Sequence, residues 1–417
     1  MITVSRELYP ADQDESVNAF QCANSAYPIY AEATGLAMLE VRRSAETSQM
    51  WRSPDNGETW TLADEIPIES ATLEGLFTET SVGPLYRDPD NGRIVRFQQQ
   101  RLYTVPASAR PTYFESRDAF VPNSHTVYYQ VSVEGGHTWT ASRQLIEQGE
   151  GFNPNHWAQD VTFREGCAVL GEPPPFHKLA DGRIVFPCQV RTAVNADTLG
   201  SIQAGRFYAE WDAEGTGLTW TSGGRVPGGG CEQTIAPLAD GRLLNILRAQ
   251  GQIKAYPFDA WLRPCTVSDD GGVTWSEPRP LAFDDGQGLT SPRAWSVLIR
   301  SEANGRLYWI ANILPAFDTE ASAAIRSRYT GRADPRYPLC VAEVDEAAVA
   351  LKHDTLTVIQ DREPHMPHWV RLSNYHVYND RETGDLVVLM LVSYCEHQED
   401  RGERPWPSYR YRITVGA

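Results

Sequence analysis

The sequence has 417 residues, with 54 acidic and 37 basic side chains and a formal net charge of −17. A body this acidic repels nucleic acid and anionic membrane surfaces, so neither is an expected partner. No apolar run is long enough to span a bilayer, and 41% apolar with 22% charged residues is ordinary for a globular protein.

A turn that ends in glycine and leads into an apolar strand recurs along the chain. An Asp-Gly or Asn-Gly turn between apolar runs is the strongest short-range signal for a β-hairpin. The six copies read EATGLAMLEV (32–41), DPDNGRIVRF (88–97), LADGRIVFPC (179–188), LADGRLLNIL (238–247), EANGRLYWIA (302–311) and RETGDLVVLM (381–390). This repeat predicts an all-β fold with one blade per copy, in a single domain over residues 1–417.

A second pattern, Ser-x-Asp-x-Gly-x-Thr-Trp, lies between these strands. It reads SPDNGETW (53–60), SVEGGHTW (132–139) and SDDGGVTW (268–275), with a degenerate copy EGTGLTW (214–220). The pattern is typical of a compact hairpin in which the carboxylate accepts backbone N–H groups, glycine permits positive φ and tryptophan packs underneath.

These eight-residue strings resemble the Asp-box of the sialidase superfamily. The resemblance covers the chain from about residue 32 to 390 and implies a sialidase-like, six-bladed β-propeller with Asp-box hairpins. Asp-boxes identify this fold rather than an activity. We expect the strand near 2–9 to complete the last blade beside 409–415, because closure removes exposed sheet edges.

The fourth and sixth blades match the sialidase pattern of active-site residues best. Sialidases place a Glu, the base for a tyrosine nucleophile, before the Gly-turn strand, and after it an Arg that binds the substrate carboxylate. Glu232 and Arg248 fit these two positions, with a structural ion pair as the alternative. Tyr375, before the last Gly-turn strand, resembles the nucleophile. A phenol is a weak nucleophile that needs an adjacent base; the alternative for Tyr375 is a core tyrosine.

The fifth blade offers a second arginine for the substrate carboxylate. Arg336 stands at the start of a strand, where sialidases carry such a residue, and Arg326, Arg328 and Arg332 compete for the role in the same loop. The arginine fork matches a carboxylate with two parallel hydrogen bonds, which is why such sites use Arg rather than Lys.

The first blade matches less well. Sialidases carry Arg-Ile-Pro ahead of the first Gly-turn strand, whereas this chain has Ala-Tyr-Pro-Ile (26–29), so the first arginine of the family's triad is missing. Arg42 resembles an accessory sugar-binding arginine. Glu46 is the only acid in the loop 44–48, where the family has its acid/base Asp, and a Glu can also serve as general acid. The alternative for Glu46 is a solvated loop carboxylate.

No motif for a cofactor or a required metal is present. The nine histidines form neither H-x-x-x-H nor H-E-x-x-H, and neither a dinucleotide fingerprint nor a Walker loop occurs. The seven cysteines are scattered without C-x-x-C, which favours buried free thiols in a reducing compartment. The start of the chain lacks a secretory signal pattern, so we expect a cytoplasmic protein unless a signal was removed.

Three functions follow as hypotheses, each with a carbohydrate partner. The resemblance implies a retaining exo-glycoside hydrolase of exo-α-sialidase type that acts on an acidic sugar, through Tyr375, Glu232 and an arginine clamp. The missing triad arginine leaves open a propeller polysaccharide lyase for uronate glycans, which would use His and Tyr to abstract a proton; His125, His156, His177 and His376 are the candidates. The third is a non-catalytic glycan-binding propeller with tryptophans that stack on sugars.

Overall fold

The computed structural model describes most of the chain. The described residues are 2–9, 28–43, 47–73, 76–106, 124–159, 161–162, 166–170, 176–191, 203–226, 230–248, 261–314, 336–367, 370–393 and 407–416. Contacts divide the chain into two compact units. We call residues 27–172 and 176–226 unit A, and residues 1–26, 173–175 and 227–417 unit B.

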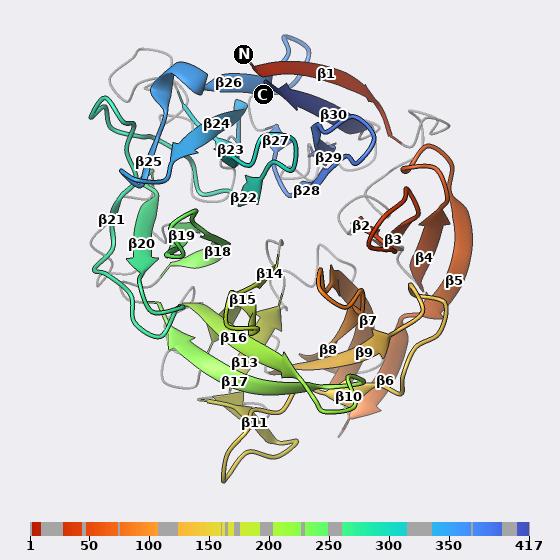
Figure 1. Cartoon of the computed structure of the whole chain (residues 1–417). Helices are drawn as coiled ribbons and strands as arrows, with labels where there is room; N and C mark the ends of the chain where they lie inside the picture. Colours follow the sequence, from red (N-terminus) through yellow and green to blue (C-terminus); the bar gives the residue numbers. More distant parts are fainter. Residues whose placement is uncertain are drawn as a thin grey trace. The chain divides into compact units, whose positions relative to one another are not determined.

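Unit A contains three blades built from successive antiparallel strands (Figure 1). Its strands are β2 (Ile29–Tyr30), β3 (Met38–Arg43), β4 (Thr47–Ser53), β5 (Thr61–Pro67), β6 (Glu69–Leu73), β7 (Leu76–Arg87), β8 (Ile94–Pro106), β9 (Ser124–Ser132), β10 (Arg143–Gln144), β11 (His156–Ala158), β12 (Val161–Thr162), β13 (Gly166–Leu170), β14 (His177–Lys178), β15 (Ile184–Arg191), β16 (Gln203–Trp211) and β17 (Leu218–Arg225). Strand β13 pairs in parallel with β9 and antiparallel with β15, so it joins the second and third blades into one ten-stranded sheet.

Unit B contains the other three blades. Its elements are β1 (Ile2–Leu8), β18 (Cys231–Pro237), β19 (Leu243–Arg248), β20 (Pro264–Ser268), β21 (Arg279–Pro280), β22 (Ser296–Arg300), β23 (Leu307–Asn312), β24 (Leu339–Asp345), β25 (Ala350–Leu351), the short 3-10 helix η4 (His353–Thr355), β26 (Thr357–Gln360), β27 (Arg371–Leu372), β28 (His376–Asn379), β29 (Leu386–Ser393) and β30 (Ser408–Val415). With six blades in chain order, the fold is the six-bladed β-propeller that the repeat predicted.

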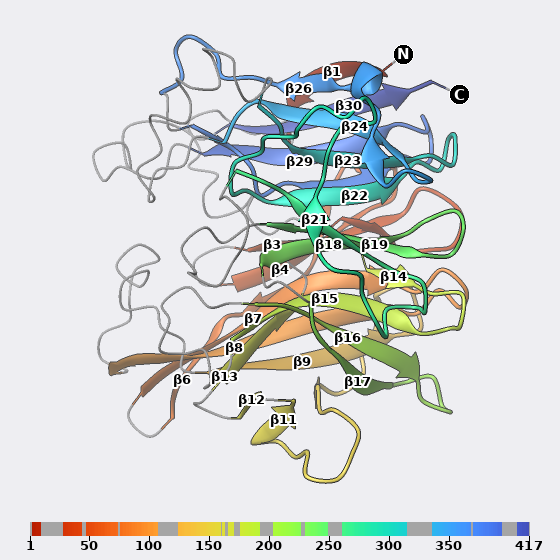
Figure 2. The same cartoon turned by 90° about the vertical axis from the view of Figure 1, so that its left-hand side faces the viewer.

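The predicted pairing between the two ends of the chain is confirmed. Strand β1 runs antiparallel to β30 in continuous register, from Ile2 opposite Val415 to Leu8 opposite Tyr409, and both views show the two strands side by side (Figure 1 and Figure 2). The N-terminal strand therefore becomes the outer strand of the sixth blade, which covers the edge that β30 would otherwise expose.

Both repeated turns have the predicted local structure. The six turn glycines all have positive φ, between 72° and 92°, a region that side chains with a Cβ rarely adopt. In the Asp-box of 268–275, the Asp270 carboxylate accepts the backbone N–H of Thr274 at 2.8 Å and its hydroxyl at 2.6 Å. These hydrogen bonds from Thr274 lower the pKa of Asp270 to about 2. Trp275 donates to the carbonyl of Gly272 at 3.0 Å, which closes the hairpin.

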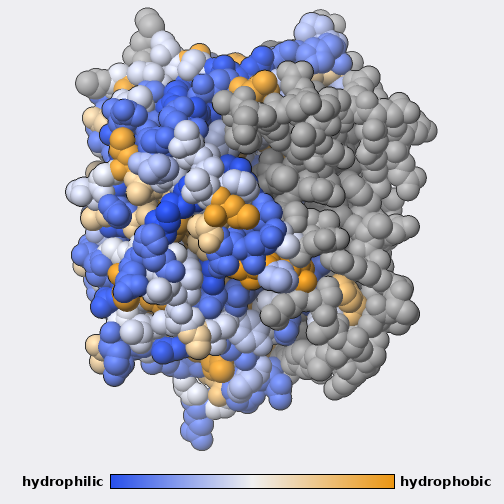
Figure 3. All heavy atoms as spheres, turned by 90° about the vertical axis from the view of Figure 1, so that its right-hand side faces the viewer, coloured by the Kyte–Doolittle hydropathy of each residue, from blue (hydrophilic) through white to orange (hydrophobic). Residues whose placement is uncertain are grey.

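Each of the two units has a buried core of its own. Unit A buries an aromatic cluster that includes Phe97, Phe186 and Trp220, and unit B buries a mainly aliphatic cluster around Trp309. The four cysteines whose side chains are described, Cys188, Cys231, Cys265 and Cys340, are free and buried, as expected. On the face drawn in Figure 3, small apolar patches are separated by hydrophilic residues. No helix among the described residues is long and apolar enough to cross a membrane.

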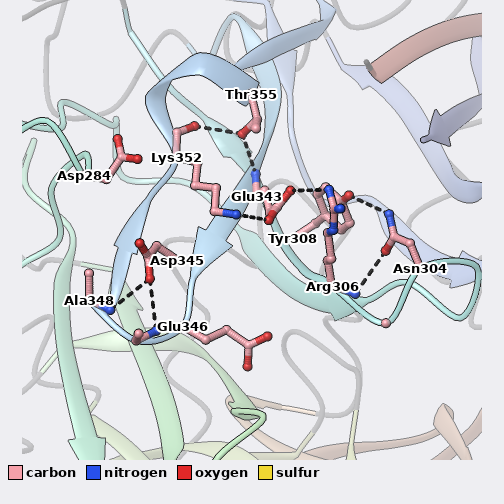
Figure 4. A network of polar contacts seen from close by, with 12 residues as sticks. Asp284, Asn304, Arg306, Tyr308, Glu343, Asp345, Glu346, Ala348, Lys352 and Thr355 are labelled. Carbon is pink, nitrogen blue, oxygen red and sulfur yellow. Dashed lines mark hydrogen bonds and ion pairs between the residues drawn. The ribbon is translucent and has the colours of Figure 1, made fainter. Parts of the chain in front are cut away.

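Blade five carries a network of polar contacts on its outer strands (Figure 4). The Glu343 carboxylate on β24 accepts from Lys352 and lies 3.3 Å from Arg306 Nη1. The backbone N–H of Glu343 donates to Thr355 Oγ1 at 2.9 Å, which ties η4 to β24. Nearby, Asn304 donates to the Tyr308 hydroxyl at 3.0 Å.

Candidate functional site

The strands that open the fourth, fifth and sixth blades, β18, β22 and β28, lie side by side in unit B. The N–H of Leu298 on β22 donates to Thr234 Oγ1 on β18 at 2.9 Å. On the other side of β22, the Trp295 ring meets the edge of the His376 ring, with centroids 6.3 Å apart, and Asn379 donates to the carbonyl of Arg300 at 3.0 Å. These contacts hold the three strands next to one another within unit B.

Glu232 lies at the start of β18 in an unusual backbone conformation. Its φ of 40° falls in the left-handed region, which costs free energy for a residue with a side chain. The pairing of β18 with β19 also shifts register between Cys231 and Thr234, so the strand has a bulge at Glu232. Bulges and strained residues are enriched at functional sites because they redirect a side chain.

The Glu232 carboxylate forms an ion pair with Arg248, as the sequence suggested. Arg248 ends β19 and stands opposite Cys231 in the sheet, so the two side chains come from the two ends of one hairpin. Oε1 of Glu232 binds Arg248 Nη1, and the two side chains are only 18% and 20% exposed. Oε2 of Glu232 is buried and has no hydrogen-bond partner among the described residues, which leaves one acceptor atom of an otherwise paired carboxylate available.

Arg336 lies close to the same carboxylate and binds the segment that leads into β28. Its Nη1 lies 3.2 Å from both Ser373 Oγ and Asn374 Oδ1, and its side chain is buried. Its backbone also pairs with Arg371 on β27. The competing candidates Arg326, Arg328 and Arg332 lie outside the described residues.

Arg263 is a third arginine of the cluster, which the sequence analysis did not identify. It is 1% exposed and donates through Nε to Ser291 Oγ at 2.8 Å, and through Nη2 to the carbonyls of Pro292 and Ala294, each at 2.7 Å. Burial, and next the charge of Arg248, lower the pKa of Arg263 to about 10, while Glu232 opposes the shift. The guanidinium therefore remains charged at neutral pH.

The arginines keep Glu232 ionised. Burial alone would raise the pKa of this carboxyl, but the charges of Arg248, Arg336 and Arg263 and the hydrogen bond from Arg248 outweigh burial and lower the pKa below its ordinary value. An ionised carboxylate with a free oxygen can accept a proton or stabilise positive charge, and it is unsuited to donate a proton.

Tyr375 occupies the position of a core tyrosine. Its side chain is 0% exposed, and its hydroxyl donates to the carbonyl of Ile310 on β23 at 2.6 Å. Burial raises the pKa of the phenol well above its ordinary value. No hydrogen bond joins Tyr375 to Glu232 among the described residues. The role of Tyr375 as nucleophile therefore stays a prediction, and its burial favours the alternative of a core tyrosine. Its neighbour His376 is neutral, because burial lowers the pKa of the imidazole to about 3.

The two first-blade candidates belong to unit A. Arg42 on β3 binds Glu40 Oε1 through Nε at 2.6 Å, its guanidinium lies 4.6 Å from the centre of the Trp51 ring, and its side chain is 13% exposed. These contacts hold Arg42 within its own blade, and its role in sugar binding stays a prediction. Glu46 lies outside the described residues.

The histidines proposed for lyase chemistry lie in strands. His125 is the second residue of β9, and it is 6% exposed. Burial, and next the charge of Arg101, lower its pKa to about 3. His156 and His177 lie in β11 and β14. No group of three or more metal-ligating side chains occurs in the part of the chain that the structure describes.

Residues 85–378 match the family of the BNR repeat-like domain, and this span is more than half of the chain. The chain belongs to this family. The resemblance to the sialidase superfamily that the Asp-boxes carried is therefore confirmed, and we refer to the chain below as the BNR propeller. No curated protein matches the sequence.

Solved structures similar to the BNR propeller include glycoside hydrolases and a protein of unknown function, all at low sequence identity. The protein of unknown function, from Dyadobacter fermentans, aligns with a TM-score of 0.60 at 12% identity, over 100% and 99% of the two chains. A K499G mutant of the NanB sialidase from Streptococcus pneumoniae aligns with a TM-score of 0.55 at 12% identity, over 98% of the BNR propeller and 70% of the sialidase. The intramolecular trans-sialidase from Ruminococcus gnavus aligns with a TM-score of 0.51 at 14% identity, over 95% and 96% of the two chains. The GH93 α-L-arabinofuranosidase of Fusarium graminearum aligns with a TM-score of 0.51 at 9% identity, over 98% and 97%. At these identities the comparison shows the fold of the BNR propeller.

Proposed function

We propose that the BNR propeller is an exo-glycoside hydrolase that acts on an acidic sugar, with Glu232 as base and with Arg248 and Arg336 as the clamp for the sugar's acid group. One observation carries the proposal: the charges of three arginines, Arg248, Arg263 and Arg336, act on the carboxylate of Glu232. The site is therefore locally rich in guanidinium groups, in a chain whose net charge is −17.

The arginines favour an anionic ligand. Arginine forks bind carboxylates through two parallel hydrogen bonds, so Arg248 and Arg336 suit the carboxylate of an acidic sugar. The rest of the acidic chain would repel the same ligand. The ligand would therefore bind at the arginines rather than elsewhere on the protein.

Three of the similar structures are glycosidases of different specificity, namely a sialidase, a trans-sialidase and an arabinofuranosidase. They support a glycan as the substrate in general, and the charge of the cluster selects the acidic class among glycans. The missing triad arginine favours an acidic sugar whose acid group is placed differently from that of sialic acid.

In the proposed reaction, the Tyr375 oxygen attacks the anomeric carbon as Glu232 accepts the phenolic proton, and a loop acid, with Glu46 as the candidate, protonates the leaving oxygen. Water then attacks the anomeric carbon and gives its proton to the loop acid, while the tyrosyl–sugar bond breaks and Glu232 returns the phenolic proton to Tyr375. The anomeric configuration is therefore retained. The Tyr375 hydroxyl must first leave the carbonyl of Ile310, which makes a local movement part of the mechanism.

The test is a turnover assay on sialosides, other ulosonic acid glycosides, uronate polysaccharides and arabinofuranosides. Release of reducing sugar from an acidic substrate, lost in Glu232→Gln, is the expected result. A product that absorbs ultraviolet light would identify a lyase. Release from the neutral arabinofuranoside alone would contradict the role of the arginines. Binding without turnover of any substrate would identify a glycan-binding propeller.

A further inference from the structure

We propose that Arg263 is a positioning residue of this site, which fixes the entry of β22 with Trp295 and places a buried positive charge near Glu232. The inference rests on the proposed function only in taking Glu232 as the base, and the sequence pattern assigns no role to Arg263. One set of contacts and one charge interaction carry it.

The first contribution is mechanical. Three acceptors within four residues, Ser291 Oγ and the carbonyls of Pro292 and Ala294, bind the Arg263 guanidinium at 2.7 to 2.8 Å. The backbone N–H of Ser291 also donates to the carbonyl of Trp261 at 2.8 Å. Residues 291–294 lead directly into Trp295, so Arg263 ties the strand entry that carries this indole to the start of β20.

The indole of Trp295 has an unusual environment. Its side chain is 6% exposed, and its N–H group is buried without a hydrogen-bond acceptor among the described residues. A buried indole normally finds an acceptor. Because Trp295 packs against His376 beside Tyr375, a small movement of the strand entry would change the wall of the candidate site.

The second contribution is electrostatic. The charged groups that act on Glu232 are Arg248 on β19, Arg263 before β20 and Arg336 before β24. Arg248 is paired with Glu232 directly, and Arg336 has Ser373 and Asn374 as partners. Arg263 is the most deeply buried of the three, and its Nη1 has no hydrogen-bond partner. A charge in a poorly hydrated position is weakly screened, so it acts at longer range than a surface charge.

Two substitutions separate the mechanical and the electrostatic contributions. Arg263→Lys keeps the charge but loses the fork that reaches three acceptors, whereas Arg263→Gln loses the charge as well. Glu232 is followed by NMR titration of protein with carboxyl-labelled glutamate, assigned by the signal lost in Glu232→Gln. Trp295 is followed by fluorine NMR of fluorotryptophan-labelled protein, assigned with Trp295→Phe. Neither measurement needs a substrate, so a failure of the proposed hydrolase activity stays distinguishable.

In Arg263→Gln we expect the Glu232 titration to move to higher pH and the Trp295 resonance to shift or broaden. In Arg263→Lys we expect the Glu232 titration to stay near that of the unaltered protein while the Trp295 resonance still changes. If Arg263→Gln does not fold, the lysine variant alone decides, because the two signals must respond differently in it.

The matched control is Arg410→Gln. Arg410 is also a buried arginine of unit B, 4% exposed, with Glu7 as its partner, and it is not among the groups that act on Glu232. It should leave both signals in place. An unchanged Glu232 titration in folded Arg263→Gln, a rise in Arg263→Lys as large as in Arg263→Gln, or an unchanged Trp295 resonance in Arg263→Lys would each overturn the proposal.

Discussion

Two carboxylates of unit B, Glu343 and Glu232, lie near more than one cation, and their surroundings differ. Glu343 on β24 is 5% exposed, and each of its oxygens has a cationic partner (Figure 4): Lys352 at Oε1 and Arg306 at Oε2. These cations are 38% and 51% exposed, so water solvates the outer side of the network. Glu232 has a partner at one oxygen only, while Arg263 and Arg336 near it are 1% and 8% exposed.

Because their surroundings differ, we interpret Glu343 as part of a structural ion-pair network and Glu232 as part of a candidate functional site. In the Glu343 network both carboxylate oxygens have a cationic partner, and both cations are exposed enough for water to solvate them. The Glu232 cluster instead holds its carboxylate on a strained backbone beside the buried Arg263, and Glu232 Oε2 and Arg263 Nη1 have no hydrogen-bond partner among the described residues. Buried groups in such a state cost stability, and sites retain them where a ligand or a reaction uses them.

The largest expected difference in activity is between Glu232→Gln and Glu343→Gln, which each neutralise one of the two carboxylates. Glu232→Gln should lower kcat by about a hundredfold or more, the usual contribution of a positioned base, while Glu343→Gln should keep kcat within about twofold. Both variants should lose stability, since each leaves cations without their partner. The measurement is kcat on the substrate found in the panel, at a temperature where circular dichroism shows both variants folded. Equal losses of kcat in the two variants would contradict the proposal that Glu232, and not Glu343, belongs to the functional site.

A comparison of two buried tyrosines, Tyr375 and Tyr308, tests whether Tyr375 is the nucleophile. Tyr375→Phe and Tyr308→Phe each remove one buried hydroxyl, bonded to the Ile310 carbonyl and to Asn304 respectively. Each should lower the free energy of unfolding by about 1 kcal/mol, measured by urea denaturation. Only Tyr375→Phe should abolish turnover. If both variants keep full turnover, Tyr375 is a core tyrosine and another group attacks the sugar.

The pH dependence should also distinguish the site. The folded-state pKa of Glu232 is lowered, so its ionisation stabilises the fold above the unfolded pKa, about 4.3 for glutamate, and this contribution disappears as the pH falls through the folded value. The stability difference between the unaltered protein and Glu232→Gln should therefore shrink below about pH 4.3. The check is urea denaturation of both proteins from neutral to acidic pH. A difference that grows as the pH falls would contradict an ionised Glu232.

The sequence predicted those features that depend on neighbouring residues. Gly-turn spacing and the Asp-boxes gave the blades, because hairpins are local structures. Glu232 and Arg248 were found together because they flank a single hairpin. Arg263 escaped notice because its role depends on burial and on acceptors about thirty residues away in sequence. The hydrogen bond from Tyr375 to Ile310 joins residues 65 positions apart on different blades, and the sequence contains no signal for such a contact.

The smallest effect should come from Lys352→Met, which removes one cation from the Glu343 network. Lys352 is 38% exposed, so water screens its charge, and Arg306 remains at the other oxygen. The expected loss of unfolding free energy is at most about 1 kcal/mol, and it should shrink in high salt, because an exposed pair is screened. Urea denaturation at low and high salt measures both quantities. A large loss of unfolding free energy that does not depend on salt would mean that Lys352 stabilises Glu343 as it would a buried charge. The Glu343 network and the Glu232 cluster would then not differ in their exposure to water.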